Sequence, residues 1–428
     1  MKSDNILNIP QLIKESGSQM FNTMWEGIRM FGLEHCDLPT MLWNVAVFLR
    51  VLTLNIDNRY TEGIPLPFYI ITLVAASCYF YVYLISMSWF VFCRCLQTGD
   101  LVPAMVVLSL GISSEIGTLK LFYMILHVDK IRKIAEDYLK CDSEVEPNSR
   151  FSANLLKSLR YVKKRAIIYW MVLIGNGFLY LIKPVFTPGK HLPEDYYILY
   201  GFEPVFESPN YEITYFATVA GIFFVCYVPA NITAYLIVIA GYTESQMLAL
   251  SEEMLHLWSD ALKAVDKYEE KAYQSELVNR IISKRLKYVI KRHTIVLNLY
   301  IQVEDVFRGA IAMGFVLLIL GLIAELLGGL ENTYLQMPFA YMQVAMDCFT
   351  GQRVMDASLV FERAIYECKW ENFDKSNMKM VLVILQNAQK TMTLSAGGIT
   401  MLSFSCLMTV TRAIYSAYTA LRTTMNKI

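Results

Sequence analysis

The chain has 428 residues, of which 55% are hydrophobic and only 18% are charged, and its 38 basic residues balance its 38 acidic residues. Soluble domains carry about 45–50% apolar and about 25% charged residues. An apolar excess without net charge excludes a secreted globular protein and a disordered chain. It also excludes a nucleic-acid-binding protein, which needs a basic excess. We therefore expect an all-α integral membrane protein.

The N-terminal region, residues 1–65, is predicted to lie in the cytosol. It contains one apolar stretch, 40–56, which has Arg50 near its middle. A central Arg costs about 2.5–3.5 kcal/mol on insertion scales. This stretch is therefore predicted to be an interfacial or re-entrant helix that does not cross the membrane.

The region 66–360 contains six apolar stretches of the length needed to cross a bilayer, which is about 20 residues. These predicted transmembrane helices are 66–93, 101–127, 165–186, 213–243, 301–327 and 332–352. A seventh uncharged stretch runs from Thr391 to Thr411. The sequence therefore predicts seven transmembrane helices.

The loops between these helices alternate in charge. Loops 128–165 and 244–300 and the segment 350–390 are rich in Lys and Arg, whereas the loop 187–212 is acidic. Because loops rich in Lys and Arg stay on the cytoplasmic side, the alternation places the N-terminus inside. G-protein-coupled receptors have the opposite orientation, so seven helices do not by themselves indicate that class.

The two cytosolic arms within 244–300 are predicted to continue the fourth and fifth transmembrane helices as amphipathic helices. Apolar residues recur along both at helical spacing, with Arg and Lys between them in the second arm. This pattern indicates either an intracellular bundle packed within the chain or a domain through which subunits assemble.

No catalytic motif is present in the sequence, so we predict no enzyme activity, no cofactor and no metal. Glu253 and His256 have the spacing of half a di-iron motif, but they lie on a charged arm and are predicted to be solvated. Asn231 begins a glycosylation sequon deep inside the fourth predicted helix, where a polar packing contact is expected. Glu115 is an intramembrane carboxylate and therefore a candidate functional group, with Lys120 as its candidate partner.

The outer loop is rich in proline and aromatic residues. Five of the thirteen prolines lie between 183 and 212. Because proline fixes its own backbone dihedral φ, the loop is predicted to be stiff and packed, and suited to cover an apolar pocket.

Three groups of motifs run through the chain. The first is cytosolic: Tyr138-Leu-Lys-Cys-Asp142, Arg150-Phe-Ser-Ala-Asn-Leu-Leu-Lys157 and Val162-Lys-Lys-Arg-Ala166. The second covers the outer loop and the fourth helix: Pro188-Gly-Lys-His-Leu-Pro-Glu-Asp195, Tyr200-Gly-Phe-Glu-Pro204, Glu207-Ser-Pro-Asn-Tyr-Glu-Ile213, Pro229-Ala-Asn-Ile-Thr-Ala234 and Gly241-Tyr-Thr-Glu-Ser-Gln-Met-Leu-Ala-Leu-Ser251. The third is C-terminal: Ala396-Gly-Gly-Ile-Thr-Met-Leu-Ser403 and Ala413-Ile-Tyr-Ser-Ala-Tyr418. Together these motifs resemble the insect odorant receptors, and more narrowly the moth sex-pheromone receptor group.

This resemblance implies a ligand-gated, non-selective cation channel in the plasma membrane of olfactory sensory dendrites. It implies seven helices with the N-terminus inside, and assembly as a tetramer with the shared odorant-receptor co-receptor. The chain lacks the long insertion between the fourth and fifth helices that is typical of the co-receptor, so it resembles a ligand-tuning subunit. The resemblance also divides the last segment into a cytosolic anchor, 361–390, and a pore-lining helix, 391–424.

The second, third, fourth and sixth predicted helices supply candidate ligand-binding residues. These are Ser109, Ser113, Ile116, Trp170, Leu173, Phe178, Tyr215, Phe216, Phe223, Phe339 and Tyr341. A mostly apolar cleft with a few hydroxyls suits a long hydrocarbon chain with one polar end. The resemblance suggests unsaturated long-chain acetates, alcohols or aldehydes as the volatile ligand. An ordinary interhelical core would contain the same residue types.

Small polar residues recur along one face of the last predicted helix, at spacings of three and four. This polar stripe indicates either a pore lining or a close-packing seam between helices. The resemblance favours a pore lining, whose candidate residues are Thr409, Ser416, Thr419, Ala420 and Thr423.

Two functions therefore compete for this membrane protein. The first is an odorant or pheromone receptor that acts as the tuning subunit of a cation channel. The second is a secondary transporter, a class that tends to show inverted repeats, and no repeat between the halves of this sequence is evident.

Overall fold

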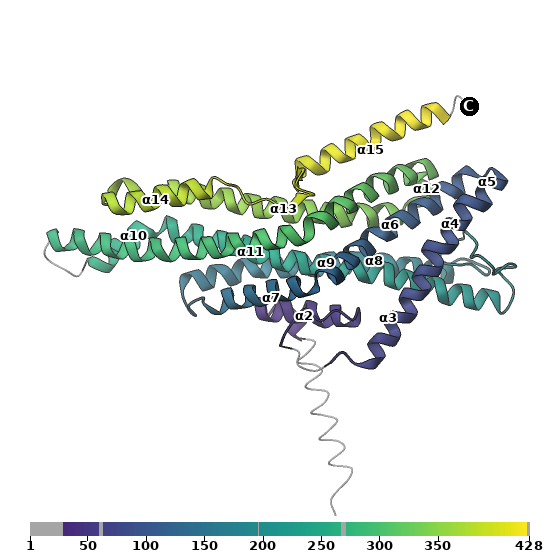
Figure 1. Cartoon of the computed structure of the whole chain (residues 1–428), viewed down its shortest axis with the longest axis horizontal. Helices are drawn as coiled ribbons and strands as arrows, with labels where there is room; N and C mark the ends of the chain where they lie inside the picture. The colour runs from purple at the N-terminus through teal and green to yellow at the C-terminus, as the bar shows by residue number, and fades with distance from the viewer. Residues whose placement is uncertain (1–28, 60–62, 196, 267–270, 426–428) are drawn as a thin grey trace, which may run out of the picture.

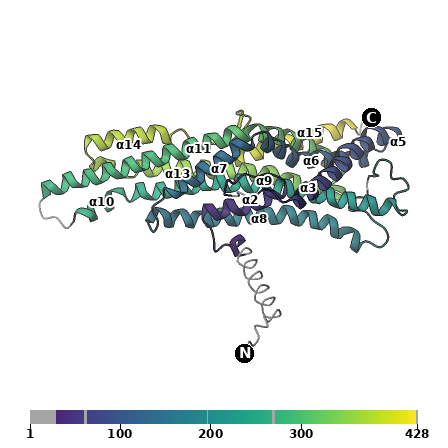
Figure 2. The ribbon, with the colours of Figure 1, turned by 60° about the horizontal axis from the view of Figure 1, so that its bottom comes forward.

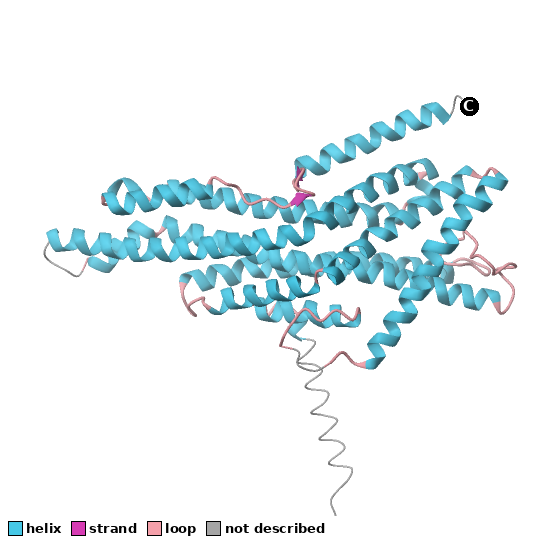
Figure 3. Cartoon of the chain, in the orientation of Figure 1, coloured by secondary structure: helices cyan, strands magenta, loops and turns pink. Residues whose placement is uncertain are grey.

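The computed structural model of the chain describes residues 29–59, 63–195, 197–266 and 271–425 (Figure 1). These ranges are almost entirely helical, with one small hairpin near the C-terminal end (Figure 3). Of the predicted N-terminal region 1–65, the first 28 residues lie outside the described part of the chain.

Most of the helices lie along a common long axis and form an elongated bundle, whereas the helix from α3 to α5 crosses this axis obliquely (Figures 1 and 2). In chain order the first is α2 (Leu38–Val51). One continuous helix follows, made up of α3 (Leu66–Tyr79), η1 (Phe80–Ser86), α4 (Met87–Trp89), η2 (Phe90–Arg94) and α5 (Cys95–Thr98). The remaining helices are α6 (Leu101–Leu126), α7 (Val128–Ser143), α8 (Arg150–Phe186), α9 (Asn210–Leu255), α10 (Leu257–Val265), α11 (Lys271–Gly328), α12 (Leu330–Thr333), α13 (Gln336–Tyr366), η3 (Trp370–Asn372), α14 (Lys375–Ala388) and α15 (Phe404–Met425).

Five helices of the described chain are long and apolar enough to cross a membrane. They are Leu66–Thr98, Leu101–Leu126, Arg150–Phe186, Asn210–Leu255 and Gln274–Gly328. With 31 and 22 residues, α13 and α15 are long enough but less apolar. The chain is thus an all-helical membrane protein. Five of its seven predicted transmembrane helices are long and apolar enough to cross a membrane.

The centre of the bundle is α9. The most apolar part of α9 is 94% buried, which is the expected position for a helix that is hydrophobic on every side. It contacts α8, α13, α3, α6 and α2. Close approach needs small residues, because a side chain at Gly117 of α6 would collide with Pro229 of α9, and one at Gly241 would collide with Val162 of α8.

A charge cluster around the buried Glu244 joins three of these helices. Both oxygens of Glu244 on α9 are paired, one with Arg165 of α8 and the other with Arg353 of α13, each at 2.6 Å. The Arg165 guanidinium also lies over the Phe349 ring, 5.3 Å from its centroid. Because the Glu244 carboxylate is buried, it needs both cations, and this requirement fixes the three helices relative to one another.

One end of the bundle extends well beyond any membrane. With 58 residues, α11 rises about 87 Å, whereas the hydrocarbon core of a bilayer is about 30 Å thick. The start of α11 gathers with α10 and α14 at one end of the molecule, opposite α5 and the C-terminus (Figures 1 and 2). The sequence-predicted arms in 244–300 are therefore helical continuations of α9 and α11.

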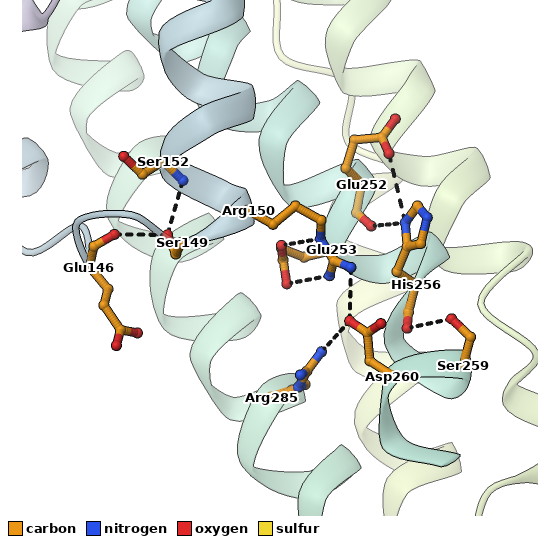
Figure 4. Close-up of polar contacts among 10 residues, drawn as sticks. All are labelled: Glu146, Ser149, Arg150, Ser152, Glu252, Glu253, His256, Ser259, Asp260 and Arg285. Carbon is orange, nitrogen blue, oxygen red and sulfur yellow. Dashed lines mark hydrogen bonds and ion pairs between the residues drawn. The ribbon is translucent and has the colours of Figure 1, made fainter. Parts of the chain in front are cut away.

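Ion pairs hold this extramembrane end together (Figure 4). Both Arg150–Glu253 hydrogen bonds, from Nε to Oε1 and from Nη2 to Oε2, are 2.9 Å long. The Oδ2 of Asp260 lies 2.8 Å from a guanidinium nitrogen of Arg150 and of Arg285. Burial raises the pKa of Asp260, but hydrogen bonds from Arg285 and Arg150 outweigh it and lower that pKa overall. His256 bonds to the backbone of its own helix.

The predicted stretch 40–56 forms α2, a helix of 14 residues. Asp37 caps its start by accepting a hydrogen bond from the Thr40 amide. A helix of this length rises about 21 Å, too short to cross a bilayer, and it packs on α9, α3 and α7. Arg50 is buried and donates to the carbonyl of Gly63.

The last segment differs from the predicted continuous helix 391–424. Residues 389–403 are not helical, and two short antiparallel strands, β1 (Ser395–Ala396) and β2 (Thr400–Met401), form a hairpin there. Gly397 and Gly398 both have positive φ, which L-residues with side chains rarely adopt. The prediction of a helix starting at 391 was wrong, because this Gly-Gly pair turns the chain before α15 begins at Phe404. The predicted anchor 361–390 comprises the end of α13, η3 and α14.

Candidate ligand-binding site

An interior cavity lies where five helices meet beneath the loop between α8 and α9. Its walls come from η1, α6, α8, α9 and α13, and from two loop residues, Glu194 and Tyr197. The lining residues on the helices are Tyr83, Leu110, Ser113, Ser114, Asn176, Tyr180, Thr218, Ile222, Val225, Cys226, Gln336 and Phe339. The predicted function of the proline-rich loop, to cover an apolar pocket, matches this position.

Each helix presents one face to the cavity. On α9, Thr218, Ile222 and Val225 are four and three residues apart and therefore share a face. On α8, Asn176 and Tyr180 are four apart. Tyr83 belongs to η1, a π-helical segment, and such segments often occur at functional sites. The cavity is therefore built from side chains that ordinary helical spacing brings together.

Two of the hydrogen-bond donors at the cavity, Gln336 Nε2 and the Tyr180 hydroxyl, have no partner among the described residues. Gln336 Oε1 accepts a hydrogen bond of 2.7 Å from Ser109, and this orients the amide so that its Nε2 is left unpaired. The buried hydroxyl of Tyr180 is also unpaired. Because an unpaired buried donor is costly, these two groups favour a ligand that carries a hydrogen-bond acceptor.

Other polar lining residues are already bonded. Ser113 Oγ donates to Glu325 Oε1 of α11 at 3.2 Å, and Asn176 Nδ2 donates to the carbonyl of Leu335 at 2.9 Å. In the loop, burial raises the pKa of the Tyr197 phenol, so that this side chain stays neutral. The cavity thus combines an apolar wall with a few polar groups, among them the carboxyl group of Glu194, which is the usual composition of a small-molecule site.

The free space at the centre of the cavity is about 30 Å³, enough for one or two water molecules. A larger molecule enters only if the surrounding side chains or helices move apart. Ligand binding at this site would therefore be coupled to a change in the positions of the helices that form the wall.

The helix α13 connects the cavity to the last helix. Gln336 and Phe339 line the cavity, and two residues further on the Tyr341 hydroxyl lies 3.3 Å from Thr411 Oγ1 of α15. Further along α13, Gly351 lies against Leu402, so closely that an added Cβ would be 2.6 Å from its backbone oxygen. A shift of α13 would therefore reach α15 at Thr411 and the segment just before α15 at Leu402.

The structure separates the predicted ligand-binding residues into three groups. Ser113 and Phe339 line the cavity, and Ser109 is one hydrogen bond away, through Gln336. Ile116 and Leu173 are fully buried outside it, Tyr341 contacts α15, and Trp170 lines a different cavity. Phe178, Phe216 and Phe223 are exposed on the surface, and Tyr215 lies beside Tyr211 near the start of α9.

Sequence reasoning missed several lining residues. Asn176 lies inside an uncharged predicted helix, and Gln336 lies at the start of α13. A polar side chain within a predicted membrane helix is itself a sign of a functional site, and this sign was available in the sequence for both residues. Tyr83 was missed because the first predicted helix was not considered as part of the wall. Tyr180 gave no signal that distinguishes it from other buried aromatic residues.

The polar stripe on α15 is exposed in the single chain. Thr409, Ser416, Thr419, Ala420 and Thr423 all face outward, whereas Cys406 and Ile414 are buried against the bundle. In Figure 1 this helix diverges from the remainder of the molecule. The stripe is thus available to water or to a neighbouring subunit.

Lys120 does not pair with Glu115, as the sequence had suggested. Five residues on a helix are about 500° of rotation, which leaves the two side chains roughly 140° apart. Lys120 instead forms a buried ion pair with Asp347 of α13 at 2.7 Å, and Glu115 accepts a hydrogen bond from Tyr79. Asn231 makes the predicted packing contact, accepting a hydrogen bond from Trp170 at 3.1 Å.

No group of three or more His, Cys, Asp or Glu side chains able to hold a metal ion occurs in the described ranges. The described ranges form a multi-pass helical membrane protein. It has an apolar cavity covered by a loop and an exposed polar stripe on its last helix. This architecture defines a multi-pass membrane protein with a candidate site for a small molecule.

Comparisons with known proteins give the family. Residues 100–415 match the family described as 7tm Odorant receptor. Odorant receptor 22c of Drosophila melanogaster is 24% identical over 129 residues, which are 28% of this chain and about a third of that protein. The chain belongs to the odorant receptor family, and it is not an enzyme.

Solved structures share its fold. The insect olfactory receptor OR5 from Machilis hrabei superposes with a TM-score of 0.70 at 13% identity, over 90% of this chain and 98% of that one. The same receptor in complex with eugenol gives a TM-score of 0.69 at 12% identity, with the same coverage.

Proposed function

We propose that this chain is the ligand-tuning subunit of a heteromeric, ligand-gated, non-selective cation channel that detects a long-chain, lipid-like volatile. The observation that carries the proposal is that α13 lines the covered cavity with Gln336 and Phe339 and bonds to α15 through Tyr341. One helix therefore touches both the candidate ligand and the candidate pore helix.

The ligand is an apolar chain with an acceptor at one end. The apolar wall takes the hydrocarbon, and the unpaired donors of Gln336 and Tyr180 take a carbonyl or hydroxyl oxygen. Acetates, aldehydes and alcohols of the moth pheromone type all provide such an oxygen. Because the free space is only about 30 Å³, entry of the chain would push α13 outward relative to α6 and α9.

In this proposal α13 and α15 supply the sixth and seventh transmembrane helices, with the N-terminus and the α10–α11–α14 end in the cytosol. The odorant receptor match includes all of α13 but only the first part of α15, since that match ends at residue 415. The exposed stripe of Thr409, Ser416, Thr419, Ala420 and Thr423 would line a water-filled pore when subunits assemble. Partner copies would be supplied by the co-receptor, in a tetramer in the plasma membrane of the sensory dendrite.

Expression in oocytes tests the proposal. We expect a long-chain acetate, alcohol or aldehyde to evoke a cation current when the chain is expressed with the co-receptor, and little or no current when it is expressed alone. Strong ligand-gated current from the chain alone would contradict the tuning-subunit assignment. Ligand uptake without a current would instead support a secondary transporter.

A further inference from the structure

A second cavity lies between α2, α8 and α9, and it shares no lining residue with the first. Its volume is about 310 Å³, several times the free space in the first cavity. On α8 it is lined at Trp170, six residues before Asn176 of the first cavity, which is about 9 Å along the helix. The end of this cavity at Lys163 lies where the basic segment 128–165 meets the apolar part of α8.

The wall of this cavity is aromatic and aliphatic. Phe48 and Trp170 are stacked, with ring centroids 5.4 Å apart, and Phe31 lies 5.2 Å from Phe48. The Trp170 N–H is already bonded to Asn231, whose amide in turn donates to the Tyr227 carbonyl at 2.7 Å. The part of the cavity around Trp170 therefore offers apolar surface to an occupant. The Trp170 N–H and the Asn231 amide there already have hydrogen-bond partners.

The polar end is formed by Asn44 and Lys163, which are 7% and 4% exposed. Both donate to the carbonyl of Met30, at 2.9 and 2.8 Å, so they lie side by side. This bond orients the Asn44 amide and leaves its buried Oδ1 without a partner among the described residues. Lys163 also donates to the His35 carbonyl, which leaves the third N–H of its ammonium group for another acceptor.

These two groups select the head of an occupant. Asn44 Oδ1 needs a donor, and the Lys163 ammonium needs an acceptor. A hydroxyl group meets both needs at once. A carboxylate or phosphate would satisfy Lys163 but face the Asn44 oxygen with negative charge, and an ammonium head would be repelled by Lys163.

We propose that this cavity binds an amphiphile of the membrane that carries a single neutral hydroxyl, with its hydroxyl between Asn44 and Lys163 and its apolar body against Phe48 and Trp170. Two sources provide this chemistry, a sterol and a long-chain alcohol. The occupant would link α2 to α8 and α9, and this role is separate from that of the ligand proposed for the first cavity.

Photolabelling of the full-length chain in membranes of expressing cells tests the proposal. Three clickable diazirine probes would be compared: a sterol, a long-chain alcohol and a fatty acid of matched chain length. We expect the sterol or the alcohol probe to label peptides from 30–51 and 160–171, and the fatty acid probe to label them at least about fivefold less. Unlabelled sterol and unlabelled alcohol added as competitors identify which source binds.

Two variants make the test specific. Asn44→Leu removes the unpaired acceptor and should lower this labelling at least about fivefold, whereas the matched change Asn176→Leu in the first cavity should leave it unchanged. The labelling of both variants is compared at equal amounts of protein that elutes as a monodisperse peak on size-exclusion chromatography. Equal labelling by the fatty acid, labelling spread over the exposed surface of α8, or full labelling of folded Asn44→Leu would each overturn the proposal. If Asn44→Leu does not fold, the competition on the unmodified chain decides alone.

Discussion

The buried ion pair between Lys120 and Asp347 gives a quantitative prediction. Lys120 Nζ lies 2.7 Å from Asp347 Oδ2, and the two side chains are 3% and 2% exposed. Lys120→Met keeps the length of the side chain but leaves a carboxylate buried without its cation. Breaking a buried pair in this way costs about 3–5 kcal/mol, which lowers the ratio of folded to unfolded protein by about two to four powers of ten.

The double variant Lys120→Met with Asp347→Leu separates the pair from the rest of the packing. Removing both charges avoids the unpaired carboxylate, so the double variant should be close to the original protein in stability. The assay is thermal unfolding of the solubilised, fluorescently tagged chain followed by size-exclusion chromatography. Lys291→Met, which breaks the exposed pair with Glu144, is the control and should change little. A double variant as unstable as either single variant would refute this reasoning.

Three further predictions concern the links between parts of the molecule. Gly351→Ala places a Cβ 2.6 Å from the Leu402 backbone oxygen and should abolish ligand-evoked current, whereas Gly175→Ala, with open space around it, should not. Tyr341→Phe removes the hydroxyl that contacts α15 and should shift the half-maximal ligand concentration severalfold at unchanged surface expression, measured by antibody to an epitope tag. Asp260→Asn should lower the thermal midpoint at pH 7, because the folded-state pKa of Asp260 is depressed and the stabilisation is present above its ordinary value of 3.8. The difference in thermal midpoint between Asp260→Asn and the original chain should disappear as the pH falls below 3.8 and through the lowered pKa of Asp260. A difference in thermal midpoint that does not depend on pH would show that the ion pairs are not its cause.

The helices that carry the fold could be predicted because their apolar stretches are long and their loops alternate in charge. The lengths of α9 and α11 beyond the membrane were indicated by apolar residues at helical spacing in 244–300. The hairpin at 395–401 was missed because a window of uncharged residues does not distinguish a helix from a turn. The adjacent glycines at 397 and 398 were the signal for the turn.

The candidate site was predicted less well, because aromatic character was weighed more heavily than the helix face. On α9, Phe216 and Phe223 are seven residues apart and share a face, and both are exposed. Thr218 lies about 200° of rotation from Phe216, so it points to the opposite side, into the cavity. From a single sequence, nothing indicates which face of a helix apolar on all sides meets lipid and which meets its neighbours.

The most direct test of the proposed function is the ligand concentration that half-activates the current when the chain is expressed with the proposed co-receptor. It is measured for one residue change inside the cavity and one outside it. Ser113→Leu adds bulk to a lining position where only about 30 Å³ is free, and Phe223→Leu alters the exposed face of the bundle. We expect this concentration to rise at least about tenfold for Ser113→Leu and to stay unchanged for Phe223→Leu, at equal surface expression. An unchanged value for Ser113→Leu, or a rise for Phe223→Leu alone, would contradict the assignment of this cavity as the ligand-binding site.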